Sequence, residues 1–260
     1  MFKTFARTWR GASQDYAGLV AAGISYYAFL AMVPMLAVIA LLYGLVASPE
    51  TVARDIELAG RALPPAAASL VADQLISVTE ANDGMKGLGL LFAFGFALFG
   101  ARNAAGAMIA GLNVIFNVEE TRSFLKSNGM ALAVTLGAVV GLALAGGAIT
   151  LAATLPSEVA PFASYGLMFF FATIGAGFLY RVAPNHIAPS WGAVLPGAIL
   201  FALIWVGATA IFGAYVSQIN DYNATYGSLA AVVILLTWFY LSAYVLLLGG
   251  EFVQARFERD

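Results

Sequence analysis

Six stretches of this chain are each long and apolar enough to cross a lipid bilayer, which takes about 20 apolar residues in a helix. They cover residues 17–46, 88–116, 130–155, 159–180, 191–216 and 226–252. With 62% hydrophobic and only 10% charged residues, a water-soluble fold could not cover its surface, because soluble proteins carry about 25% charged residues. We therefore expect an all-α polytopic membrane protein, a six-transmembrane-helix bundle that forms a single domain over residues 1–260.

The basic residues gather in the loops on one side of these spans. Eight of the twelve lie in the N-terminal tail, the loops after the second and fourth spans, and the C-terminal tail: Lys3, Arg7, Arg10, Arg122, Lys126, Arg181, Arg256 and Arg259. Cytoplasmic loops carry an excess of Lys and Arg. We therefore expect both termini in the cytoplasm and the protein in a bacterial inner membrane.

The first loop, residues 48–84, is the only sizeable extramembrane segment and carries six acidic residues. Pro64 and Pro65 suit the first turn of a helix, and apolar residues follow at mostly helical spacing from Leu70 to Val78. The loop is therefore expected to hold an amphipathic helix on the periplasmic side, lying on or packing against the bundle.

The composition excludes several classes of function. The chain has no cysteine and one histidine, His186, so neither a cysteine nor a histidine metal cluster can form. A net charge of −2 gives no support for nucleic-acid binding. The sequence has no P-loop, no dinucleotide fingerprint and no nucleophile elbow. We expect no cofactor, no metal and no enzymatic activity, and we interpret His186 as a surface or turn residue.

Arg102 is the strongest candidate for a functional residue because it falls well inside the second span. A charge within a bilayer costs at least about 2.5–3.5 kcal/mol, so it needs a partner or water. Three interpretations stay open: a register-fixing pair with Glu251 near the end of the sixth span, an anion or headgroup site, and snorkelling to the interface.

Other polar residues in or beside the spans complete the candidate substrate-binding set. Ser25, Tyr26 and Tyr27 precede Pro34, which we interpret as a hinge because proline kinks a helix. They either line a cavity or bond to a neighbouring helix. The remaining candidates are Asn103, Asn113, Tyr222 and Tyr226; the two tyrosines belong to a segment that is alternatively a tight turn.

Small residues are frequent in the spans, most clearly as Gly137, Gly141 and Ala145 in the third span. Such spacing lets helix backbones approach closely. It predicts either ordinary packing within the bundle or a homodimer face.

Four blocks of the sequence resemble the YihY/virulence factor BrkB family of bacterial inner-membrane proteins. They begin at Gly23 (GISYYAFLAMVPM), Arg102 (through Val118), Val182 (VAPNHIAPSWGAVLPGAI) and Tyr222 (YNATYGSLAAVVILLTWFYLSAYVLLLGGE). The resemblance implies six spans with cytoplasmic termini. Members were long labelled as a ribonuclease, but this sequence lacks the metal cluster and the basic groove that RNA cleavage would need. Other members are linked to serum resistance or envelope lipid export, which implies a transport-like role.

Three functions follow as hypotheses. The first is a transporter or flippase, not driven by ATP, for an amphipathic or lipid-like, possibly anionic, substrate, with membrane lipids as partners. The second is a non-transporting scaffold for envelope assembly. The third, a membrane-bound enzyme, has few polar residues to support it.

Overall fold

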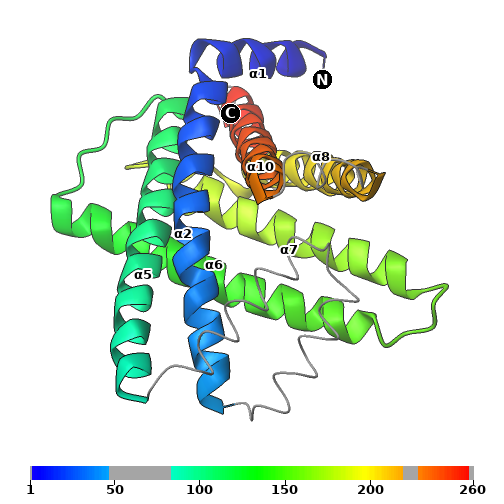
Figure 1. Cartoon of the computed structure of the whole chain (residues 1–260). Coiled ribbons are helices and arrows are strands. Elements are labelled where there is room, and N and C mark those ends of the chain that lie inside the picture. The colour runs from blue at the N-terminus through cyan, green and yellow to red at the C-terminus, as the bar shows by residue number, and fades with distance from the viewer. Residues whose placement is uncertain (1, 47–82, 219–227, 258–260) are drawn as a thin grey trace.

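The computed structural model describes residues 2–46, 83–218 and 228–257, and this part of the chain contains helices and no strands. The helices are α1 (Phe2–Gln14), α2 (Ala17–Val46), α5 (Asp83–Ile115), α6 (Phe124–Ala152), α7 (Ala160–Val182), α8 (Trp191–Gln218) and α10 (Ser228–Phe257) (Figure 1). The all-helical fold class is therefore confirmed for the described residues.

Five stretches within these helices are long and apolar enough to cross a membrane: Phe94–Ile115, Phe124–Ala152, Ala160–Val182, Trp191–Tyr215 and Val232–Phe257. They match the second to sixth predicted spans to within a few residues at most ends. The first predicted span forms α2, in which Ala17–Met32 is a shorter apolar helix. The amphipathic helix expected in the first loop lies outside the described residues.

The N-terminal residues form a helix that the sequence analysis did not predict. In Figure 1, α1 lies across the start of α2 and the end of α10 instead of running alongside them. Unlike the spans, whose apolar residues surround the whole helix, α1 is polar on average and strongly amphipathic. It was missed because a helix of this composition gives no hydropathy signal.

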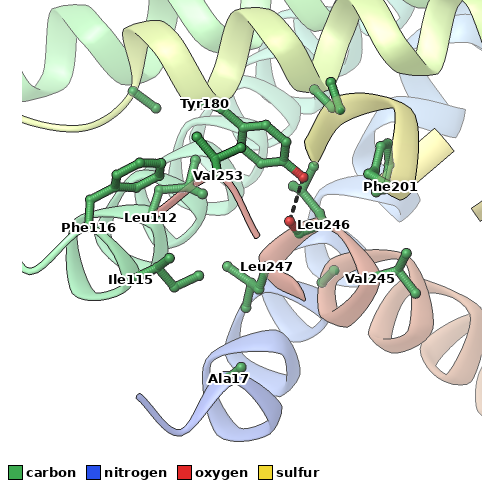
Figure 2. Close-up of a cluster of buried hydrophobic side chains, with 14 of the residues drawn as sticks. Ala17, Leu112, Ile115, Phe116, Tyr180, Phe201, Val245, Leu246, Leu247 and Val253 are labelled. Atoms are coloured by element: carbon green, nitrogen blue, oxygen red, sulfur yellow. Dashed lines mark hydrogen bonds between the residues drawn. The ribbon is translucent and has the colours of Figure 1, made fainter. Parts of the chain in front are cut away.

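The buried side chains of the spans gather at one end of the molecule, which we call the hub. The hub joins the start of α2 and α8 to the ends of α5, α7 and α10 (Figure 2), and includes Ala17, Leu112, Ile115, Tyr180, Val194, Leu247 and Val253. Away from the hub, large apolar side chains such as Phe96, Leu136 and Phe162 are more than 60% exposed. In the described chain the buried core therefore lies at one end, while α2 and α5 also approach each other closely further along, at Gly100 and Ala31.

Glycines allow the closest approaches in the hub. A Cβ on Gly249 would collide with the Tyr180 hydroxyl, and a Cβ on Gly197 would lie 2.7 Å from the carbonyl oxygen of Gly249. The Tyr180 hydroxyl donates a 2.6 Å hydrogen bond to the carbonyl oxygen of Leu246 (Figure 2). α10 therefore meets α8 at backbone distance, and the Tyr180 side chain of α7 bonds to the α10 backbone.

Gly137 and Gly141 of α6 make no such close contact in the described chain. No neighbouring helix in the described chain comes within 4 Å of a Cβ placed on Gly137 or Gly141. In the most apolar stretch of α6, only 6% of the residues are buried. In the described chain, close helix packing therefore occurs at other small residues, such as Gly100 and Gly111 of α5, and a homodimer face at Gly137 and Gly141 stays a prediction.

We expect Gly100→Ala to destabilise the protein by roughly 1–3 kcal/mol, the usual cost of overpacking. The added Cβ would lie 2.7 Å from the backbone Cα of Ala31 on α2, and a backbone atom cannot move aside as a side chain can. Gly137→Ala is the matched control, since its Cβ meets nothing. Thermal unfolding midpoints in detergent should fall for the first variant only, and equal midpoints would contradict the close approach of α2 and α5.

Candidate functional site

Arg102 lies on α5 inside the Phe94–Ile115 span, and its side chain is half-buried. Its Nη1 donates a 2.9 Å hydrogen bond to Oδ1 of the adjacent Asn103 and lies beside Gly106, one turn further on. Among the described residues, no carboxylate pairs with this guanidinium. The structure therefore joins two of the predicted site residues, an arginine and a neutral amide, within an apolar helix.

The expected pair between Arg102 and Glu251 does not form in the described structure. Glu251 is buried on α10, and its carboxylate lies against Gly11 of α1. The preceding residue, Gly250, packs against Leu112 of α5, ten residues beyond Arg102. At 1.5 Å per residue, Arg102 lies about 15 Å along the axis of α5 from the level of Gly250. The prediction was wrong because both residues were placed at one depth by counting from apparent span ends.

Two neighbouring helices flank the turn that carries Arg102. On one side, Gly100 approaches Ala31 of α2, as described above. On the other, the Thr135 hydroxyl of α6 lies 3.4 Å from the carbonyl oxygen of Ala101, although its shorter bond, 2.8 Å, goes to Ala131 in its own helix. Arg102 therefore sits where α2, α5 and α6 meet, at the margin of the hub.

The aromatic pair of α2 lies at a similar level. Ala31 is opposite Gly100 and Val20 is opposite Gly111, so Tyr27 falls near the Arg102–Gly106 turn in the antiparallel pair. The rings of Tyr26 and Tyr27 contact edge to face at 5.6 Å, and both are exposed.

The other candidates of α2 are accounted for separately. The buried Ser25 hydroxyl donates to the carbonyl oxygen of Ala22 in its own helix, at 2.8 Å, and its role in a substrate site stays a prediction. Pro34 falls within α2 where side chains are not described, so its role as a hinge stays a prediction. Tyr222 and Tyr226 lie outside the described residues.

The exposed surface near Arg102 is apolar. Phe99 and Phe96 lie one and two turns before it on α5, and both are more than 60% exposed. Residues three apart are neighbours on a helix surface. The site thus combines a cation with adjoining apolar rings, the pattern that suits an amphipathic anion.

Asn113 belongs to a different polar centre, which we call the loop clasp: Asn113, Glu119, Glu120, Thr121, Arg122, Ala183, Pro184, Asn185 and His186. It joins the loop after α5 to the loop after α7. The buried Asn113 accepts from the backbone N–H of Asn185 at 2.9 Å and donates to Glu120 at 3.0 Å. The Asn185 side chain donates to the carbonyl oxygen of Glu119 at 2.7 Å and to the Thr121 hydroxyl at 3.0 Å.

Arg122 completes the clasp. Its guanidinium donates to the carbonyl oxygens of Ala183 and Pro184 at 3.1–3.2 Å, and pairs with Glu120 at 3.4 Å. His186 lies 2.6 Å from the Thr121 hydroxyl and adopts a φ of 57°, a left-handed turn conformation. The exposed turn position predicted for His186 is confirmed.

The sequence analysis missed Asn185, Glu120 and Arg122 as one cluster. The basic residues of the sequence predict that both loops lie on the same side of the membrane. That prediction does not show that the two loops are in contact. Since every clasp residue named here has a protein partner, the clasp serves to lock the ends of α5 and α7 together. Asn113 lies eleven positions after Arg102 on α5, so it belongs to the clasp and not to the group around Arg102.

No group of three or more His, Cys, Asp or Glu residues is positioned to hold a metal ion within residues 2–46, 83–218 and 228–257. A small hollow between α8 and α10 is lined by Trp205, Thr209, Trp238 and Ser242, with the Trp205 indole donating to Ser242 at 2.9 Å. None of the predicted site residues lines this hollow.

Comparison with known proteins decides the family. A family model described as virulence factor BrkB matches residues 8–260. The chain belongs to this family. The resemblance seen in the four sequence blocks is therefore confirmed, and the chain is a multi-pass bacterial membrane protein of this family.

Individual relatives carry two kinds of name. The chain is 32% identical over 207 residues to the ribonuclease-like protein YfkH of Bacillus subtilis, covering 72% of each protein. It is 31% identical to a UPF0761 membrane protein of Alkalilimnicola ehrlichii, over 90% of this chain but only 54% of the relative. A UPF0761 membrane protein of Tolumonas auensis is 29% identical, over 94% of this chain and 82% of the relative. No solved structure matches the chain.

Asn185→Ala should lower stability by about 1–3 kcal/mol, because the buried Asn185 side chain makes two hydrogen bonds, to the carbonyl oxygen of Glu119 and to the Thr121 hydroxyl, each worth about 0.5–1.5 kcal/mol. Asn128→Ala is the control, because that partly exposed side chain donates to the carbonyl oxygen of Phe124 in its own helix. Thermal midpoints and proteolytic cleavage within residues 116–123 measure the effect. An unchanged cleavage rate for the Asn185 variant would show that the clasp does not hold the loops.

Proposed function

We propose that this protein moves an amphipathic, lipid-like substrate with an anionic headgroup across the membrane without hydrolysing ATP. The observation that supports this most directly is Arg102, a guanidinium within an apolar span whose hydrogen-bond partner in the described structure is the neutral Asn103. Ionisable residues inside a membrane are costly and usually functional. An anionic substrate would supply the missing countercharge.

The chemistry of arginine suits this role. A guanidinium has five N–H donors in a planar fork that matches phosphate and carboxylate groups. Asn103 accepts one of these bonds and so positions the fork. The remaining donors bind the headgroup, while acyl chains lie along the exposed rings of Phe99 and Phe96. Tyr26 and Tyr27 contribute further amphipathic surface at the same level of α2.

Arg102→Ala should slow transbilayer movement of an anionic lipid roughly 10- to 100-fold, the loss expected from charge-assisted hydrogen bonds of about 1.5–3 kcal/mol. The assay is reconstituted protein with fluorescent phosphatidylglycerol and dithionite quenching in the outer leaflet. Arg102→Lys should retain part of the rate. Lys126→Ala, an exposed cation at the start of α6, is the control and should move lipid at the wild-type rate.

Two results would remove the proposal. One is wild-type protein that moves no labelled anionic lipid although it is folded and inserted. The other is an Arg102→Ala variant that moves lipid at the full rate.

A second candidate function is a non-transporting scaffold for envelope assembly, and the exposed face of α6 favours it. That helix offers Gly137 and Gly141 to a partner outside the described chain. The chain has no cysteine, so a Gly137→Cys variant can be crosslinked in native membranes without background from other thiols. Specific adducts together with no lipid movement would favour the scaffold. Leu144→Cys, at another exposed position of α6, is a second crosslinking site. If neither variant forms adducts, the result counts against a partner bound to this helix.

A further inference from the structure

α1 is attached to the hub along one face. Thr4, Thr8 and Ala12 recur every four residues and are buried. The Thr8 hydroxyl donates to the carbonyl oxygen of Thr4 at 3.0 Å, so it is satisfied within its own helix. Gly11 admits the Glu251 carboxylate of α10 against the helix backbone. This face is therefore fixed to the protein and unavailable to other partners.

The rest of α1 carries a different chemistry. Arg7 and Arg10 are exposed and lie three residues apart, on one side of the helix. Trp9 is 66% exposed, although it is among the largest apolar side chains. At about 100° per residue, the indole lies on one flank of the buried face and the arginines lie on the other. The helix sequence contains no acidic residue.

We propose that α1 lies in the membrane interface and binds anionic phospholipid headgroups through Arg7 and Arg10, with Trp9 inserted at the boundary of the acyl chains. Helices of this kind have a basic flank and an aromatic flank, and lie in the plane of the interface. Tryptophan favours this depth because its ring is apolar and its N–H is polar. Arginines near an anionic surface add electrostatic attraction.

The position of α1 fits this occupant. Figure 1 shows the helix crossing the ends of α2 and α10, at the same end of the bundle as the hub. The loop clasp with Arg122 lies at the ends of α5 and α7, which also meet in the hub. The basic helix is therefore on the side that the charge distribution predicts to face the cytoplasm, where the leaflet surface is negative. This inference does not depend on lipid transport by Arg102.

The test uses nitroxide labels on the full chain, which has no native cysteine. Ser13→Cys follows Trp9 by one turn, and Gln14→Cys follows Arg10 by one turn; both positions are exposed. Each labelled protein is reconstituted in phosphatidylcholine liposomes with and without roughly 30 mol% phosphatidylglycerol, which supplies the anionic headgroups. Collision rates with oxygen and with a water-soluble nickel complex report the depth of each label.

The label at residue 13 should collide mainly with oxygen, and the label at residue 14 mainly with nickel. Adding phosphatidylglycerol should reduce nickel access to residue 14 by about twofold or more, because headgroups cover the arginine flank. The double variant Arg7→Gln/Arg10→Gln should lose this dependence on anionic lipid, and Arg7→Lys/Arg10→Lys should keep it.

Equal nickel access at both labels in both lipids would overturn the interfacial position. A depth that does not respond to phosphatidylglycerol, or a response that the glutamine variant retains, would overturn headgroup recognition. Because the labelled proteins that keep Arg7 and Arg10 answer the first question in two lipid compositions, a poorly folded arginine variant does not leave the proposal open. The Ser13 and Gln14 labels do not touch the transport residues, so failure here leaves the Arg102 proposal standing.

Discussion

The close approach of α10 to α8, together with the bond from the Tyr180 side chain of α7 to α10, is the contact on which the rest of the structure depends. In lipid, apolar side chains gain little by meeting one another, so helices associate through tight packing and hydrogen bonds. Gly197 and Gly249 remove the side chains that would separate the backbones, and the Tyr180 hydroxyl bonds to the carbonyl oxygen of Leu246. The hub is built around this contact, and the firmly packed ends of the other spans extend from it.

Two further features secure the same end of the molecule. The loop clasp ties the loop after α5 to the loop after α7 through Asn113, Asn185 and Arg122. α1 covers the end of α10 and receives Glu251 at Gly11. Arg102 lies about 15 Å along α5 from this level, where packing gives way to exposed apolar rings. A cation at the margin of a rigid core can meet lipid without disturbing that core.

Much of the fold was predictable because membrane-spanning helices need long apolar runs, and these are visible in the sequence. The expected span at 191–216 begins at the first residue of α8 (Trp191–Gln218), and the span at 17–46 coincides with α2 (Ala17–Val46). α1 was missed since its apolar residues are few and its amphipathic pattern is short. The Arg102–Glu251 pair was wrong because depth within a span cannot be counted when helices cross at unequal levels.

The sequence by itself determined that this chain lies in a membrane, that its long apolar segments are helical, and that Arg102 falls inside one of them. These properties depend on composition and on local periodicity, which act along the chain. Only the tertiary structure decided that Arg102 contacts Asn103, that Glu251 meets Gly11, and that Asn113 serves the clasp. Contacts of this kind depend on the angle and level at which helices cross, and those follow from side-chain packing between segments far apart in the sequence.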